Sequence, residues 1–148
     1  MKKLYLCLIP SSSWFSNARS VLSKEEWNSV RRKVYESNNF ECYFCGKKKL
    51  DKPEAHELFE YDTEKSLQIL TKVICVCKKC HHCCHWGLWQ LKGEEDELYR
   101  HIMKVNGWSK PEAQKHVAES FKVWQDRSNI DWDLDLTILY EKYGLSRD

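Results

Sequence analysis

Two Cys-x-x-Cys pairs separated by 31 residues constrain this chain more than any other feature of its sequence. Cys42 and Cys45 form the first pair, and Cys77 and Cys80 form the second. A two-residue gap lets both sulfurs of a pair reach one ion, and four thiolates suit a tetrahedral Zn²⁺. The pattern predicts a structural zinc site. Because zinc binding is worth about 10–16 kcal/mol in zinc-finger peptides, we expect that this segment does not fold without its metal.

Disulfides and plain core residues are the alternatives for these cysteines. The apolar run Leu4–Ile9 is too short for a signal peptide and ends at Pro10 without a small-residue cleavage site. We therefore expect a reducing, cytoplasmic location in a bacterial or phage-infected cell, where paired cysteines favour a metal over cystine.

The other four cysteines have different expected roles. Cys84 lies four residues after Cys80, so on a helix it faces the same way, and Cys83 or Cys84 is an alternative zinc ligand. Redox chemistry between these two is disfavoured, because vicinal cysteines on a helix are poorly placed to pair. Cys7 and Cys75 are expected to be buried small hydrophobes.

Length and charge bound the remaining possibilities. With 148 residues, of which 42% are hydrophobic, the chain can form one core plus an appendage. Residues 1–50 carry ten Lys or Arg and four acidic residues, although the whole chain has a net charge of only +2. A basic front half suits a polyanion such as DNA, and a solvated lysine-rich surface is the alternative. No apolar run is long enough to span a membrane, so no membrane partner is expected.

The first 50 residues predict a loop, a basic helix and the first cysteine knuckle. Trp14 and Phe15 lie in a Ser-rich loop and are expected to enter a core or a partner. Ser23 and Glu26 form a predicted capping box for a helix that runs to about Ser37. Its predicted buried stripe is Trp27, Val30 and Val34. The candidate nucleic-acid contacts are Arg31, Arg32 and Lys33 on this helix and Lys47 and Lys48 after the knuckle.

The middle of the chain predicts two strand regions and a helix. Residues 54–61 read as a strand in which His56 and Leu58 share one face. Residues 67–70 and 73–76 read as strands that deliver Cys77, and the second knuckle then opens a helix. His81 and His85 lie four residues apart on that helix, beside the cysteine side.

The order of these motifs carries a family resemblance. A CxxC pair, the strand Ala55-His56-Glu57, and the run Cys77-x-x-Cys80-His81-x-x-x-His85 together resemble the zinc-stabilised HNH, or His-Me finger, nucleases over residues 40–88. The resemblance implies a ββα-metal unit. The flanks resemble a bacterial and phage group of small HNH-like proteins through Ser13-Trp14-Phe15-Ser16-Asn17, Val105-Asn106-Gly107-Trp108, Trp124-x-x-Arg127-Ser128, Trp132 and Asp135.

The resemblance also implies roles for the histidines. His56 matches the general base that activates water, and His85 matches the histidine that binds a divalent metal at the scissile phosphate. His81 is a second ligand or a strut. The implied catalytic metal is Mg²⁺, Mn²⁺, Ni²⁺ or Zn²⁺. Each histidine also has a structural alternative: a carboxylate partner for His56, a capping role for His81, or packing against a tryptophan for His85.

The chain departs from the family pattern at two positions. An acidic metal ligand often precedes the first histidine, and here that position is Ala55; Glu57 can replace it only if the strand is bulged or twisted. The middle Asn is absent, with Gln68 the nearest amide and Glu60 and Asp62 possible replacements.

The last third of the chain predicts helices without identifiable chemistry. One helix is expected over 94–104, closed by Asn106 and Gly107, and a second from a capping box at Ser109 and Glu112 to about Arg127. Residues 130–136 alternate apolar with acidic residues and form either a solvated face or a surface for a basic partner. The remaining histidines are expected on the outer face: His82, His101 and His116.

Two functions follow from these observations. The expected fold is α+β, a zinc-stabilised ββα-metal core (40–90) between an N-terminal segment with a basic helix (1–39) and a helical C-terminal extension (91–148). The first function is a metal-dependent endonuclease acting on DNA, with His56, His81, His85 and Glu57 as candidate catalytic residues. The alternative is a zinc-binding protein, inactive or weakly active, that binds another protein, for example as a phage-encoded modulator of a host system.

Overall fold

The structure is a computed structural model that describes residues 3–13 and 21–146. Trp14 and Phe15, expected to enter a core or a partner, lie outside the described residues. Within the described ranges the fold is mixed α+β, with a three-stranded sheet and six α-helices. The elements are η1 (Ser11–Ser13), α2 (Lys24–Ser37), β1 (Glu54–Asp62), β2 (Leu67–Val76), α3 (Lys78–Cys84), α4 (Trp86–Leu91), α5 (Glu95–Asn106), α6 (Lys110–Arg127), β3 (Asp133–Asp135) and α7 (Thr137–Glu141).

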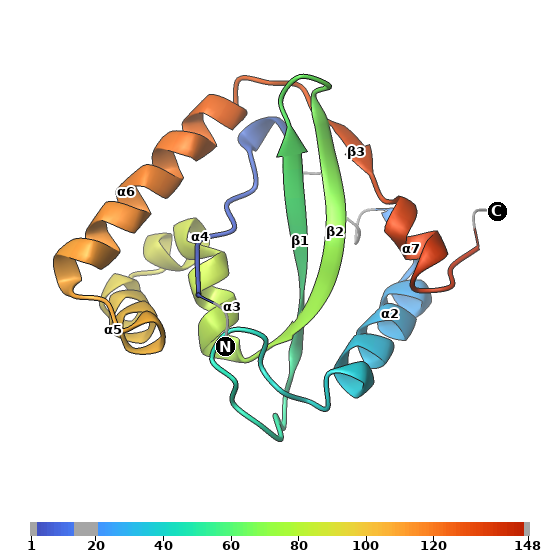
Figure 1. Cartoon of the computed structure of the whole chain (residues 1–148), viewed down its shortest axis with the longest axis horizontal. Coiled ribbons are helices and arrows are strands. Elements are labelled where there is room, and N and C mark those ends of the chain that lie inside the picture. The colour runs from blue at the N-terminus through green and yellow to red at the C-terminus, as the bar shows by residue number, and fades with distance from the viewer. Residues whose placement is uncertain (1–2, 14–20, 147–148) are drawn as a thin grey trace.

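A long antiparallel hairpin of β1 and β2 forms the centre of the fold (Figure 1). The two stretches expected as separate strands form the single strand β2. Thr71 does not break it, because the pairing register shifts between Leu58 and Phe59 and accommodates Thr71 as a bulge. The Thr71 hydroxyl donates a hydrogen bond of 3.2 Å to the carbonyl of Leu58.

The third strand comes from the alternating segment near the C-terminus. β3 pairs in parallel with the start of β2, where Leu67 lies opposite Asp133 and Ile69 opposite Asp135. The Asp133 amide donates to the carbonyl of Ser66 over 2.8 Å. This pairing places α7 beside β2, so the C-terminal end of the chain belongs to the same body as the hairpin.

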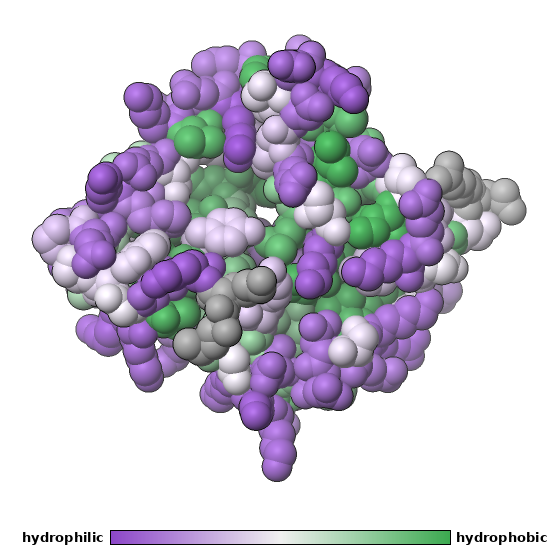
Figure 2. All heavy atoms as spheres, in the orientation of Figure 1, coloured by the Kyte–Doolittle hydropathy of each residue, from purple (hydrophilic) through white to green (hydrophobic). Residues whose placement is uncertain are grey.

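Helices cover both faces of the sheet, and each face has its own core (Figure 1). Residues directly opposite each other in antiparallel strands point to the same face, and neighbours along a strand alternate. His56 pairs with Ile74 on the face that packs against α3, α5, α6 and the N-terminal segment. Ala55 pairs with Cys75 on the face that packs against α2 and α7. Figure 2 shows hydrophobic residues in a hollow at the centre of the viewed face, rimmed by hydrophilic ones.

The main helix starts and ends follow local sequence rules. Both predicted capping boxes are confirmed: Ser23 with Glu26 opens α2, and Ser109 with Glu112 opens α6. Gly107, with φ of 67°, ends α5 as the sequence predicts. These contacts lie within four residues along the chain, which is why the sequence alone identifies them.

The expected outer-face positions of two histidines are wrong. The His101 ring lies 3.1 Å from the sulfur of Cys80, and the Nε2 atom of His116 accepts a hydrogen bond from the amide of Leu6. Both histidines are on helices that pack against the core, so each ring meets a segment distant in sequence.

Cys75 is fully buried as expected, whereas Cys7 is only half-buried. Among the described residues, none of the helices combines the length and the apolar character needed to cross a bilayer.

Candidate metal centres

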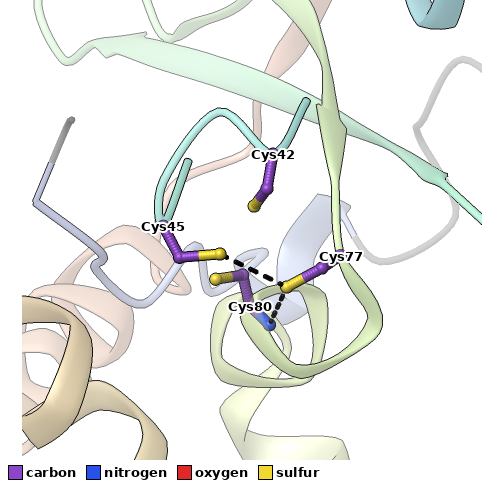
Figure 3. Close-up of side chains that lie close together, drawn as sticks. All are labelled: Cys42, Cys45, Cys77 and Cys80. Atoms are coloured by element: carbon purple, nitrogen blue, oxygen red, sulfur yellow. Dashed lines mark hydrogen bonds between the residues drawn. The ribbon is translucent and has the colours of Figure 1, made fainter. Parts of the chain in front are cut away.

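Four cysteine sulfurs meet where the first knuckle, β2 and α3 come together (Figure 3). Cys42 and Cys45 lie on the knuckle loop, Cys77 follows the end of β2, and Cys80 lies in the first turn of α3. All four sulfurs lie within 4.8 Å of one another. We call this group the cysteine cluster, and it can hold a structural metal ion.

The spacing of the sulfurs fits a tetrahedral ion. The Cys45 and Cys77 sulfurs are 3.8 Å apart. A tetrahedral ion with metal–sulfur bonds of about 2.3 Å separates its ligand sulfurs by about 3.8 Å, whereas a disulfide separates them by about 2.05 Å. The observed distance matches the ion-bound geometry and excludes a disulfide at this pair.

Backbone hydrogen bonds hold both knuckles in shape. The Cys42 amide donates to the carbonyl of Lys47 over 2.9 Å, and the Gly46 amide donates to the carbonyl of Cys42 over 3.0 Å. Gly46 has the positive φ, 73°, that the sequence predicts after the second ligand. In the second knuckle, Cys77 is the N-cap of α3 and its sulfur accepts from the Cys80 amide over 3.5 Å. The sulfurs therefore converge because two tight turns direct them.

The cysteine cluster cannot keep four thiolates by itself. Hydrogen bonds from the Cys77 and Cys80 thiols lower the pKa of Cys42 far below its usual value. The same interactions with Cys42 raise the pKa of Cys77 to about 12 and raise the pKa of Cys80 well above the ordinary range. Cys42 therefore favours the thiolate form while Cys77 and Cys80 favour the thiol, so an incoming cation must displace the protons of these two sulfurs. The His101 ring, 3.1 Å from the Cys80 sulfur, supports the cluster from α5.

Three histidines converge on the α3 face of the sheet. His56 comes from β1, His81 from α3, and His85 is the C-cap of α3, with its amide still bonded to the carbonyl of His81. One ring nitrogen from each lies within 4.8 Å of the others, and the ring centroids are 4.8–5.1 Å apart. We call this group the histidine cluster. The neighbouring His82 stacks on Trp89, with ring centroids 3.5 Å apart.

A carboxylate fixes the orientation of His81. The Glu54 Oε1 atom lies 2.7 Å from the Nδ1 atom of His81. A carboxylate only accepts hydrogen bonds, so Nδ1 carries the proton in the neutral ring and Nε2 keeps its lone pair. That Nε2 atom lies 3.1 Å from the Nε2 atom of His85. Two imidazoles on one ion at about 2.0–2.1 Å place their nitrogens about 3.3 Å apart in a tetrahedral site, so this pair is arranged to share a cation.

Sequence reasoning missed Glu54, although a signal was present. Glu54 and His56 are two residues apart in the same strand and therefore share a face, which places the carboxylate beside α3. Glu57 does not join the histidine cluster. The register is regular from Glu54 to Leu58, so Glu57 pairs with Val73 on the α2 face. Gln68, the nearest amide to the missing Asn, is buried and donates toward the hydroxyl of Tyr61 over 3.4 Å.

Cys83 and Cys84 lie outside the cysteine cluster in the structure. Both are fully buried, and the Cys83 sulfur donates to the carbonyl of Leu98 over 3.6 Å. Neither sulfur belongs to the group of four sulfurs that lie within 4.8 Å of one another. Cys84 instead lies beside Cys7 and His56.

The five candidate nucleic-acid contacts divide into two groups. Lys47 and Lys48 are exposed on the first knuckle, next to the cysteine cluster. Arg31, Arg32 and Lys33 are on α2, across the sheet from α3. Arg31 donates to Asn28 over 2.7 Å, and Lys33 donates to the carbonyl of Tyr143 over 2.8 Å. The structure therefore does not bring the basic helix to the histidine face.

Comparisons with family models, with curated proteins and with solved structures found no match to this chain. The geometry and chemistry of the two clusters are therefore the basis for assigning a function.

Proposed function

We propose that this protein is an HNH-like, metal-dependent endonuclease that hydrolyses DNA phosphodiester bonds, with β1, β2 and α3 as its ββα unit. The observation that carries the proposal is the convergence of His56, His81 and His85 on one face, with Glu54 hydrogen-bonded to His81. One buried and two half-buried imidazoles with an oriented ligand pair are a costly arrangement for a purely structural role, and they match what phosphodiester hydrolysis requires.

In this proposal the three histidines have separate roles. His81 and His85 hold a divalent cation through the Nε2 atoms that lie 3.1 Å apart. Such a cation supplies positive charge to the scissile phosphate and its leaving oxygen. His56, on β1, accepts the proton of the attacking water. Glu54 keeps the His81 ring in the tautomer that binds metal.

The ligand type favours some cations over others. Neutral imidazole suits Zn²⁺ and Ni²⁺, whereas Mg²⁺ and Mn²⁺ prefer oxygen ligands. No carboxylate belongs to the histidine cluster among the described residues. We therefore expect Ni²⁺ or Zn²⁺ to support cleavage best, Mn²⁺ less well and Mg²⁺ least. The cysteine cluster is proposed to hold a structural Zn²⁺, because four thiolates in tetrahedral spacing suit that ion.

Exposed lysines near the clusters are proposed to contact the DNA backbone. Lys47 and Lys48 lie on the first knuckle, and Lys78 and Lys79 lie in the first turn of α3, the helix that carries His81. Lysines neutralise phosphates without reading sequence. The Lys78 and Lys79 pair was not among the contacts expected from the sequence, and it replaces α2 as the proposed DNA-facing basic segment.

The test is plasmid cleavage by zinc-loaded protein with each added cation and with none. His56→Ala is compared with His82→Ala. His82 lies on α3 next to His81 but outside the histidine cluster. We expect at least a 10²-fold slower cleavage for His56→Ala and a rate near wild type for His82→Ala. Equal rates for His56→Ala and wild type, at equal zinc content, would contradict the assignment of the base.

A second function is favoured by the residues that depart from the family pattern. Ala55 is buried on the α2 face, and Gln68 is held at Tyr61, so neither contributes to the histidine cluster. A chain that keeps the zinc scaffold but lacks these polar groups suits binding to another protein. Wild-type protein that keeps its zinc and fold but cuts no DNA with any cation would favour this function, and capture of a protein partner is then the next experiment.

A further inference from the structure

A third group of metal-ligating atoms lies beside the histidine cluster. The Cys7 and Cys84 sulfurs and one ring nitrogen of His56 all lie within 4.8 Å of one another. Cys84 and His56 are buried, while Cys7 is half-buried. The Cys7 amide donates to the carbonyl of Cys84 over 2.9 Å, which fixes the N-terminal segment against the end of α3. A contact between residues 77 positions apart thus brings two thiols to the imidazole.

We propose that Cys7, Cys84 and His56 form a binding site for a thiophilic cation of the Zn²⁺ class. Two sulfurs and one imidazole nitrogen are a donor set that soft and borderline-soft cations prefer over Mg²⁺ or Ca²⁺. Three protein ligands leave a fourth position for water. The site is distinct from the cysteine cluster, because it shares none of that cluster's four sulfurs.

Cys7 is the ligand of this site that lies nearest the surface. Cys7 lines a small pocket of about 70 Å³ between the N-terminal segment and β1, together with Leu6, Leu58 and Arg127. The half-buried Cys7 sulfur faces the core side of that segment, where Cys84 and His56 lie. A cation would therefore meet the Cys7 sulfur before the buried Cys84 and His56.

Occupancy would regulate the proposed nuclease, and this step rests on the proposed function. His56 belongs both to this site and to the histidine cluster. A neutral imidazole has one nitrogen with a lone pair and one with a proton. When the lone pair of His56 binds a cation beside Cys7 and Cys84, the ring has no lone pair left to accept a proton from water. Excess thiophilic cation should therefore inhibit cleavage at a place distinct from the catalytic cation.

Cobalt absorption tests the site without reference to cleavage. Protein carrying one zinc per chain, with retention of that zinc measured throughout, is titrated with Co²⁺ and the thiolate-to-cobalt charge-transfer band is followed. Cobalt bound by histidines alone lacks that band. We expect the band in wild type, and binding at least ~10-fold weaker in Cys7→Ser and Cys84→Ser. Cys83→Ser is the matched control, because Cys83 is the buried neighbour of Cys84 and lies outside all three groups.

The outcomes separate the two proposals. No thiolate band in zinc-loaded wild type, or an undiminished band in Cys7→Ser, overturns the site. Cys7→Ser decides the matter even if the buried Cys84→Ser variant fails to fold, because Cys7 is half-buried. If the band behaves as expected and the protein cuts DNA, excess Zn²⁺ should inhibit wild type at a concentration ~10-fold lower than Cys7→Ser. Equal inhibition of wild type and Cys7→Ser would overturn the regulatory step. If the protein cuts no DNA, the cobalt titration still decides whether the metal site exists.

Discussion

The cysteine cluster and the histidine cluster share the helix α3, yet the fold assembles them in different ways. Each cysteine pair is local in sequence and is aimed by its own tight turn. The histidine cluster joins β1 to α3, and its geometry depends on the packing of the helix against the sheet. A side chain from outside supports each cluster: His101 contacts Cys80, and Glu54 contacts His81.

The clusters also differ in what an ion contributes to them. Four thiolates at this spacing repel one another, so the cysteine cluster can carry all four charges only with a bound cation. Imidazoles in their neutral form carry no charge, so the three histidines meet without that repulsion. We infer that the ion of the cysteine cluster supplies folding free energy, whereas the ion of the histidine cluster supplies chemistry. One short helix thus carries both, and the two contributions should separate by mutation.

The largest expected effect comes from removing one sulfur of the cysteine cluster. Cys80→Ser should abolish cooperative thermal unfolding, because structural ion binding worth about 10–16 kcal/mol is as large as the whole usual stability of a domain, about 5–15 kcal/mol. His85→Ala, in the other cluster, should keep a cooperative transition. Circular dichroism melts with measured zinc content check this difference.

The control for Cys80→Ser is Cys75→Ala, which alters a fully buried cysteine in the α2-side core. Its expected cost is about 1 kcal/mol, the usual size for a small core change. A Cys80→Ser variant that melts like Cys75→Ala would show that the ion does not support the fold.

The second effect sharpens the role of the carboxylate at the histidine cluster. Glu54→Gln keeps a hydrogen-bond acceptor near the Nδ1 atom of His81 but removes the negative charge. Loss of such a partner costs about 10–100-fold in metal affinity. We expect weaker binding of the activating cation, with the cleavage rate recovered at saturating cation. A purely structural role of Glu54 would lower the thermal midpoint without changing cation affinity, and Glu57→Gln, on the other face, is the matched control.

The contrast between local and non-local contacts also explains how far sequence reasoning reached. The capping boxes at Ser23 and Ser109 and the turn at Gly46 were predictable, because their determinants lie within four residues. The meeting of the cysteine pairs was predictable for a chemical reason, since four thiols at that spacing have few other uses. The fold class as mixed α+β followed from the same patterns.

Contacts across long stretches of chain were not predictable. The position of His101 at Cys80 depends on how α5 crosses α3, which no local pattern encodes. The place of Cys7 beside Cys84 depends on the path of an N-terminal segment that has no regular secondary structure between residues 3 and 10. The parallel pairing of β3 with β2 joins segments more than 60 residues apart. Hydrophobic periodicity and capping motifs identify helices and strands, but only tertiary packing decides which of their faces meet.

A third and smaller effect concerns the supporting histidine of the cysteine cluster. His101→Phe preserves the ring and its burial but removes the nitrogen that lies 3.1 Å from the Cys80 sulfur. A hydrogen bond of this kind contributes about 1 kcal/mol, which corresponds to a roughly fivefold change in an equilibrium constant. We expect zinc transfer to a chromophoric chelator at a roughly fivefold lower chelator concentration. An unchanged transfer curve would show that the ring only fills space there.

The last expected effect is of similar size and tests a region that belongs to neither cluster. Burial lowers the pKa of His116 below its ordinary value, and its Nε2 atom accepts the hydrogen bond of the Leu6 amide only when the ring is neutral. The folded chain therefore takes up fewer protons at this ring than the unfolded chain does, so stability is lost as the pH falls below the unfolded value of about 6.5 and is fully present above it. His116→Gln should lose about 1 kcal/mol at a pH of about 7.5 and close that gap with wild type at about pH 5. Urea unfolding midpoints at the two pH values, with Lys115→Gln as the exposed control on α6, measure the change. If the gap between His116→Gln and wild type is the same at both pH values, protonation of His116 does not weaken the attachment of the N-terminal segment.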